Sequence, residues 1–124
     1  MVGGTGPRVL RLTAELADHW NGGARTSEET ERLLAEVDGA CRAAGRDPAT
    51  LKRSVETIVR VLPANYAAPN QGADEVAEDP ATIAEVIRRY ARLGIDHLQI
   101  QLRPNSVEGV EAFRPVIETL DAGE

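Results

Sequence analysis

Strand-like and helix-like segments alternate along the second half of the sequence, and this alternation restricts the fold more than any other feature. Residues 53–62 are rich in β-branched side chains, which predicts a strand. Residues 79–94 carry apolar side chains at helical spacing and end at a glycine, whereas residues 96–102 return to the period of a strand. A strand, a helix and a strand in this order are typical of a right-handed βαβ unit with parallel strands.

The strand expected at residues 96–102 has one apolar and one polar face. An open doubly wound sheet is covered by helices on both sides, so its strands are usually apolar on both faces. A barrel strand with polar side chains on its inner face fits this pattern better. The apolar face comprises Leu98, Ile100 and Leu102, and the polar face comprises His97, Gln99 and Gln101.

The remaining segments continue the same alternation. Residues 3–7 read as a turn that leaves a strand and enters a helix, although Met1 and Val2 are too few to form a strand before it. About four βα units follow, whereas a whole (β/α)8 barrel needs eight. We therefore expect an α/β fold in which residues 1–124 form one domain, a partial TIM barrel with parallel strands. Helices are expected at 7–18, 27–44 and 107–120, a short strand near Trp20, one helical turn at 47–51 and a loop at 63–78.

Composition agrees with a globular domain and excludes several classes of partner. Of the 124 residues, 42% are hydrophobic and 27% are charged. The net charge of −6 argues against nucleic acid or an anionic membrane surface as a partner. No segment approaches the ~20 apolar residues of a membrane span, and the N-terminus lacks the pattern of a signal peptide. The cytoplasm is the expected compartment, because a lone cysteine requires no oxidising environment.

Most of the reactive side chains have a structural interpretation. Cys41 falls on the apolar stripe of a predicted helix, which is typical of a buried thiol, and Trp20 is expected in the core rather than in a cofactor pocket. His19 has no identifiable partner, and two scattered histidines make no metal site. His97 begins its strand, whereas barrels carry their active sites at the carboxyl ends of the strands. No residue qualifies as a catalytic base or nucleophile, so the catalytic residues stay unassigned.

Two polar residues near the carboxyl end of the last strand are better candidates for a binding site. Gln101 lies on the polar face close to that end and is expected to face the site. Arg103 follows it, and either reaches an anionic group or lies in solvent.

The glycine turn, residues 3–6, is the candidate for a phosphate site. Glycines let the backbone approach a ligand closely and adopt positive φ, and the helix that follows directs N–H groups and its positive dipole end at the turn. Barrels bind phosphates at such late βα turns. On its residues alone, the turn is more often a tight structural turn than a phosphate site. It consists of Gly3, Gly4, Thr5 and Gly6.

Four segments in order resemble one family. They are Gly-Gly-Thr-Gly-Pro-Arg-Val-Leu-Arg-Leu at 3–12, Ala-Asp-His-Trp-Asn at 17–21, Ala-Gly-Arg-Asp-Pro-Ala-Thr-Leu at 44–51 and Leu-Gly-Ile-Asp-His-Leu-Gln-Ile at 93–100. Together they resemble the luciferase-like monooxygenases, the flavin- and deazaflavin-dependent (β/α)8 barrels related to bacterial luciferase. The resemblance covers almost the whole chain but only the C-terminal half of that barrel. The N-terminal half, which supplies much of the flavin-ring pocket and many catalytic side chains in the family, is absent.

The resemblance implies an oxidoreductase module that binds the phosphate of FMN or F420 at the glycine turn and acts on a small-molecule substrate. The alternative is a non-catalytic, truncated half-barrel that binds a phosphate ligand or self-associates. A half-barrel leaves two strand edges unpaired. We therefore expect as partner either a second copy in a homodimer or the missing N-terminal half-barrel.

Overall fold

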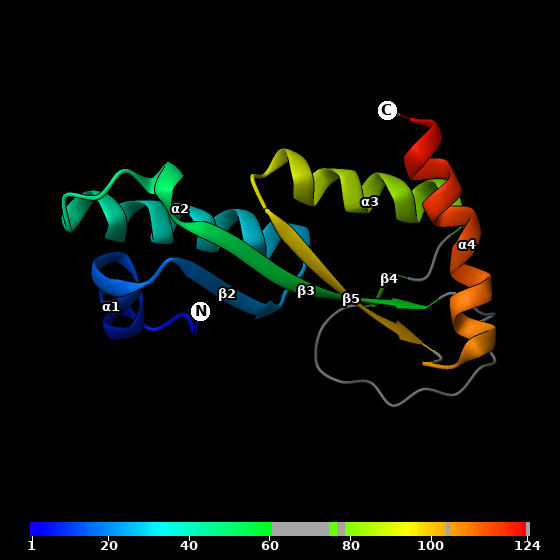
Figure 1. Ribbon diagram of the computed structural model, residues 1–124, viewed down its shortest axis with the longest axis horizontal. Coiled ribbons are helices and arrows are strands. Elements are labelled where there is room, and N and C mark those ends of the chain that lie inside the picture. Colours follow the sequence, from blue (N-terminus) through cyan, green and yellow to red (C-terminus); the bar gives the residue numbers. More distant parts are fainter. Residues whose placement is uncertain (61–74, 77–78, 104, 124) are drawn as a thin grey trace.

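The computed structural model describes residues 1–60, 75–76, 79–103 and 105–123, in which strands and helices alternate along the chain (Figure 1). The elements in order are β1 (Val2–Gly3), α1 (Pro7–Leu16), β2 (His19–Ala24), α2 (Ser27–Ala43), a 3-10 turn (Pro48–Thr50), β3 (Lys52–Arg60), β4 (Glu75–Val76), α3 (Pro80–Arg92), β5 (His97–Arg103) and α4 (Val107–Ala122). Units β1–α1, β2–α2, β3–α3 and β5–α4 confirm the expected number of βα units.

All strand pairs within the described residues are parallel, and β3 is the central strand. It pairs with β2 along one edge and with β5 along the other, in register from Ser54 opposite His97 to Arg60 opposite Arg103. The sequence-based prediction of parallel strands at 53–62 and 96–102 is therefore confirmed as far as Arg60, since residues 61 and 62 lie outside the described residues. Helix α3 connects these two strands, as expected for a βαβ unit.

Two short strands correct the sequence-based prediction. Val2 and Gly3 form β1 and pair with Trp20 and Asn21 of β2, although the start of the chain looked too short for a strand. Glu75 and Val76 form β4 beside β3, inside the segment 63–78 that was expected to be a loop. Both strands form because their backbone groups pair with a longer neighbouring strand. Such pairing cannot be predicted from the pattern of side chains. The rest of the predicted loop lies outside the described residues.

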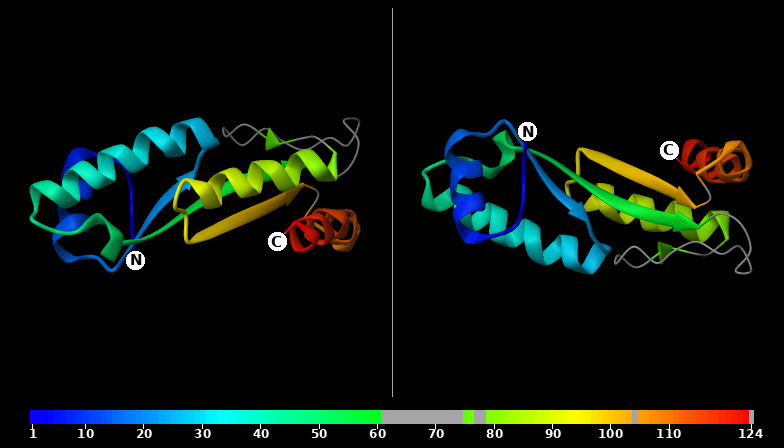
Figure 2. Two further views of the ribbon diagram at one scale, coloured as in Figure 1. Left: turned by 90° about the horizontal axis from the view of Figure 1, so that it is seen from above. Right: turned by 90° about the horizontal axis from the view of Figure 1, so that it is seen from below.

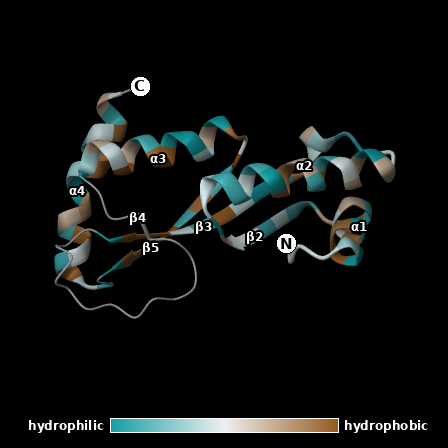
Figure 3. Cartoon of the chain, turned by 180° about the vertical axis from the view of Figure 1, so that it is seen from behind, coloured by the Kyte–Doolittle hydropathy of each residue, from teal (hydrophilic) through white to brown (hydrophobic). Residues whose placement is uncertain are grey.

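The helices begin and end where the local sequence indicates. Side-chain oxygens of Thr26, Asp79 and Ser106 each accept a hydrogen bond from the backbone N–H three residues further on. Gly45 follows α2 with φ +75°, a conformation in which glycine avoids the steric cost of a side chain. Figure 3 shows hydrophilic and hydrophobic residues along each of α2, α3 and α4, as expected of amphipathic helices.

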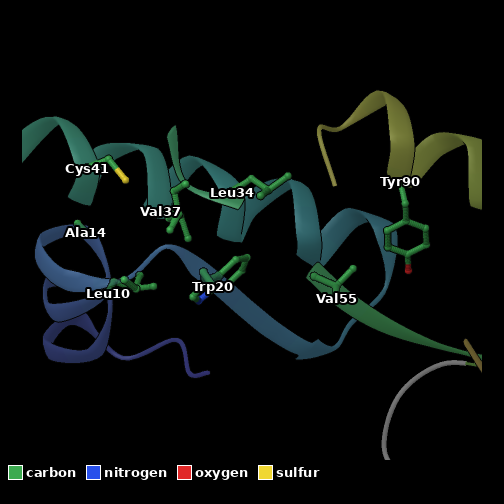
Figure 4. Packing of buried hydrophobic residues seen from close by; sticks show 10 residues of the cluster. Leu10, Ala14, Trp20, Leu34, Val37, Cys41, Val55 and Tyr90 are labelled. Atoms are coloured by element: carbon green, nitrogen blue, oxygen red, sulfur yellow. The ribbon is translucent and has the colours of Figure 1, made fainter. Parts of the chain in front are cut away.

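The core lies between one face of the sheet and the helices. Figure 2 shows α2 and α3 in front of the strands from above, and the strands in front of these helices from below. A first cluster joins α1, α2 and the sheet around Trp20, whose side chain is fully buried beside Leu10 and Val37 (Figure 4). Cys41 is also fully buried, so both residues are structural as predicted. A second cluster joins α3, α4 and the distal half of the sheet.

Tyr90 of α3 connects the first cluster to the end of β2. Its side chain is buried, and its hydroxyl donates a hydrogen bond to the carbonyl oxygen of Arg25 at 2.7 Å. Burial raises the pKa of the Tyr90 hydroxyl above its ordinary value, so the neutral form that donates this hydrogen bond is favoured.

Helix α4 presents part of its apolar stripe to solvent. Val116 is buried in the second cluster, and Phe113 and Leu120 pack against it. Val110 and Ile117, two further apolar residues of α4, are 59% and 45% exposed. The stripe is wider than the contact that α3 and β5 make with this helix, so one side of it is left without a neighbour among the described residues.

Candidate functional site

The face of the sheet that points away from the helices is polar. Along β3, Val55 and Val59 belong to the two hydrophobic clusters, whereas Ser54 and Glu56 make hydrogen bonds to side chains of neighbouring strands. This alternation follows from the period of a strand. The polar face corresponds to the interior of a closed barrel, and it contains the predicted polar side of β5.

A hydrogen-bonded group crosses the middle of this face. The Nε2 atom of His19 lies 3.0 Å from Ser54 Oγ, and Asn21 Nδ2 donates to the same oxygen at 3.0 Å. Asn21 Nδ2 also donates to Gln99 Oε1 at 3.2 Å, so three strands are joined. The expectation that His19 lacks a partner is therefore wrong. Its partner belongs to a strand 35 residues away, which no local pattern indicates.

A second group lies nearer the carboxyl ends of β3 and β5. Gln101 Nε2 donates to Glu56 Oε2 at 2.8 Å, and Arg103 Nη2 donates to Gln101 Oε1 at 3.4 Å. Arg60 stands opposite Arg103 in the strand register. The predicted site residues Gln101 and Arg103 are thus in contact on the inner face, with a carboxylate that sequence reasoning missed. Glu56 alternates with Val55 and Thr57, and that alternation was the available signal for an inward-facing acid.

The glycine turn is held by β2. The N–H of Gly4 donates to the Asn21 carbonyl oxygen at 3.3 Å, and Trp20 Nε1 donates to the Gly4 carbonyl oxygen at 2.8 Å. Gly4 has φ +128°, and an added Cβ would lie 3.0 Å from Val9 Cγ1. Only Gly4 of the three glycines in the turn takes positive φ, so the expectation of this conformation at Gly3 and Gly6 is wrong.

The amino end of α1 has no side-chain cap, in contrast to α2, α3 and α4. Gly6 occupies the N-cap position and carries no side chain, and Pro7, the first helical residue, has no N–H to satisfy. The first turn contains no acidic residue, and Arg8 is exposed in it. An added Cβ at Gly6 meets no atom within 4 Å, so the space beside the turn is open. These residues fit the phosphate group of a cofactor, which a helix amino end attracts.

The structure does not bring the glycine turn into contact with Gln101 and Arg103. Gly3 is in register with Asn21, Asn21 with Ser54, and Ser54 with His97 at the start of β5. Arg103 lies at the other end of β5. Going from β1 through β2 and β3 to β5, each strand therefore ends further along the sheet than the strand before it. The tilted strands of a barrel are offset in the same way, and their carboxyl ends lie at one rim. His97 is exposed at the amino end of its strand, as predicted.

Two surface hollows lie away from these groups. One of about 320 Å³ is lined by Arg25 and by residues of the first half of α2, including Arg32. The other, about 310 Å³, lies at the amino ends of β3 and β5, where Arg53 Nη2 is 2.6 Å from Asp38 Oδ1. Within the described ranges, no three His, Cys, Asp or Glu side chains are placed to hold a metal ion. None of the helices in those ranges is long and apolar enough to cross a membrane.

Solved structures share this fold. An F420-dependent secondary alcohol dehydrogenase, in complex with an F420-acetone adduct, matches with a TM-score of 0.68 and 17% identity over 95% of this chain and 47% of its own. The coenzyme F420 dependent tetrahydromethanopterin reductase from Methanopyrus kandleri gives 0.69 and 14%, over 98% and 49%. A long-chain alkane monooxygenase gives 0.71 and 12%, over 97% and 40%. No family model and no curated protein matches the sequence.

The chain spans about half the length of the structures that it matches. The match covers almost all of this chain. The likeness confirms the predicted fold, half of a (β/α)8 barrel. At these identities it concerns the fold alone.

Proposed function

We propose that this chain is the C-terminal half of a flavin- or F420-dependent oxidoreductase barrel, and that the glycine turn and the amino end of α1 bind the cofactor phosphate. The observation that carries the proposal is the uncapped amino end of α1, directly after Gly4 with its positive φ. The other α-helices carry a Thr, Asp or Ser cap, whose oxygen already accepts a hydrogen bond from an N–H of the first turn that an anion would otherwise take.

Each residue of the glycine turn has its own role in the proposed phosphate binding. Gly4 lets the backbone reverse toward α1, and Gly6 leaves room for a phosphate beside the first helical turn. The N–H groups at the start of α1 donate to phosphate oxygens, and Arg8 contributes positive charge. Thr5, which is partly buried, adds a hydroxyl group on the same turn. Trp20 fixes the turn through its hydrogen bond to Gly4.

Gln101 and Arg103 line the inner face near the carboxyl end of β5, where barrels bind their substrates, and Gln101 contacts Glu56 from the middle of β3. We assign them to substrate binding, with the Gln101 amide holding the Glu56 carboxylate in position. The bound cofactor supplies the redox chemistry, and the chain binds and orients the reactants. Two of the matched structures are described as F420-dependent, which supports F420 beside FMN as the cofactor.

The alternative function is a non-catalytic half-barrel that binds a phosphate ligand or self-associates. The observation that favours it is the composition of the inner face. Among the described residues of that face, hydrogen bonds engage the polar groups with one another. The one serine–histidine contact there, Ser54 with His19, has its serine buried, so the hydroxyl is not open to a substrate. Such a face binds and positions a ligand without itself performing a chemical step.

Titration of FMN and of F420 into the Gly4→Val variant tests the proposal. The new side chain is strained at φ +128° and crowds Val9, so we expect cofactor affinity to fall by about 1–3 kcal/mol. The matched control is Gly45→Val, which places the same strain at φ +75° after α2, away from the glycine turn. We expect this control to lose stability and to keep its affinity for the cofactor. Both variants are compared with the unmutated chain by absorbance and fluorescence titration.

The titration is run with the chain alone and with an N-terminal half-barrel supplied, and circular dichroism confirms that each variant is folded. If the unmutated chain binds neither cofactor in either format, the oxidoreductase proposal is wrong and the non-catalytic alternative is favoured. If a folded Gly4→Val variant keeps full affinity, the glycine turn is structural only.

A further inference from the structure

The exposed large apolar side chains of the described residues are concentrated on the first and last helices. On α1, Leu12 and Leu16 are 43% and 78% exposed. On α4, Val107, Val110 and Ile117 are 79%, 59% and 45% exposed. These two helices lie at opposite ends of the molecule in Figure 1. Exposed apolar surface that is gathered in this way marks an interaction site rather than the scattered exposure of an ordinary surface.

The same two ends carry unpaired strand edges. Among the described residues, β1 pairs only with β2, and β5 pairs only with β3. The free edge of β5 extends over its seven residues. An edge of this length presents a row of unpaired backbone groups, which proteins usually cover.

The exposed faces of α1 and α4 are complementary in charge. Arg8 and Leu12 lie four residues apart on α1, with Leu16 four further on. Arg11 adds a second exposed cation, and the one acid of this helix, Glu15, lies 4.0 Å from it. On α4, helical spacing places three exposed acids on the same face as Val110, and they outnumber the one exposed cation there, Arg114. These acids are Glu111, Glu118 and Asp121. The α1 face is therefore net positive, and the α4 face is net negative.

We propose that two copies of this chain associate head to tail, with α4 of one copy packed on α1 of the other. All strand pairs run parallel, so a twofold axis along the barrel would bring β5 of one copy beside β1 of its partner in parallel orientation. The same operation forms the second contact, and at each contact the two residues of β1 pair with part of the β5 edge. The chain covers 47% and 49% of two matched structures, so two copies supply about one barrel.

Sedimentation and light scattering of paired charge-reversal variants test this arrangement. The first variant is Arg8→Glu with Arg11→Glu on α1, and the second is Glu111→Arg with Glu118→Arg on α4. Each variant alone places like charges at both contacts, so we expect its dimer dissociation constant to rise about tenfold or more. An equimolar mixture restores opposite charges at both contacts, and we expect it to form a mixed dimer with wild-type affinity.

The matched control is Arg32→Glu with Arg42→Glu, which makes the same change of charge on exposed positions of α2. This control should remain dimeric. Circular dichroism checks the fold of each variant, and Arg8→Gln with Arg11→Gln replaces the first variant if that one is unfolded. A monomeric unmutated chain at micromolar concentration would overturn the proposal, and so would a dimer that is indifferent to both reversals. These experiments measure the mass of the assembly and not cofactor binding. A negative result therefore does not contradict the cofactor proposal.

Discussion

At the residue scale, Gly22 packs closely against the fully buried side chain of Trp20. An added Cβ at Gly22 would lie 2.7 Å from Trp20 Cη2 and 3.1 Å from Val55 Cγ1. Both of these side chains are fully buried in the first cluster, so neither has free space into which to move. Gly22 therefore lets the strand pass close to the indole ring, and a larger residue there would disturb the centre of the core.

We predict opposite effects for two Gly→Ala substitutions. Gly22→Ala forces the Trp20 ring or the strand to shift, and we expect a loss of about 1–3 kcal/mol in the free energy of unfolding. Gly39→Ala is the matched control, because it adds the same methyl group at an exposed position inside α2 where no atom lies within 4 Å. There the better helix propensity of alanine should stabilise by about 0.5–1 kcal/mol. Urea denaturation of both variants measures the difference, and equal effects would contradict this account.

Single residues of the inner face differ in how far the sequence predicts their position. Gln101 was predicted to face the site, because alternation within one strand fixes its side. Glu56 was missed although it obeys the same rule, since only the pairing of β3 with β5 shows that it meets Gln101. The contact of His19 with Ser54 likewise depends on two strands that are distant in the chain.

At the scale of single elements, the helix caps are local interactions whose strength depends on charge. Asp79 caps α3 by accepting a hydrogen bond from the Thr82 N–H at 2.8 Å. This hydrogen bond lowers the pKa of the Asp79 carboxyl below its ordinary value. The folded protein therefore holds the carboxylate in its ionised form more strongly than the unfolded chain does.

We predict that Asp79→Asn makes the protein less sensitive to acid. The contribution of Asp79 is present above the pKa of an unfolded aspartate, about 3.9, and is lost as the pH falls through the lower folded value. Asparagine also caps helices but does not titrate, so the variant lacks this part of the acid dependence. Denaturation at pH values from about 6 to 2 should show a smaller loss of stability in the variant. If the stability of the variant and that of the unmutated protein fall equally with pH, the cap is not sensitive to charge.

At the scale of the whole molecule, stability should be graded across the sheet. β3 has a neighbour on both edges and side chains in both hydrophobic clusters, including Val55 and Val59. β1 has two residues and one neighbour. Elements with few contacts open locally at lower cost than the strands at the centre of a core.

Hydrogen–deuterium exchange measured by mass spectrometry tests this gradient. We predict that peptides from Lys52–Arg60 exchange slowest and that the peptide containing Val2–Gly3 exchanges fastest among the strands. If two copies associate as proposed, protection of β5 should rise with protein concentration, whereas that of β3 should not. Slower exchange in β1 than in β3 at low concentration would contradict the gradient.

The sequence by itself determined the type and order of most elements, because helical periodicity, caps such as Thr26 and Asp79, and the alternation in β5 act between residues close in the chain. Four βα units and parallel strands followed from that order. The tertiary structure alone decided which two-residue segments join the sheet, because their pairing depends on backbone groups of distant strands. It also decided that Val110 and Ile117 remain exposed, since an apolar stripe is buried only where another element reaches it.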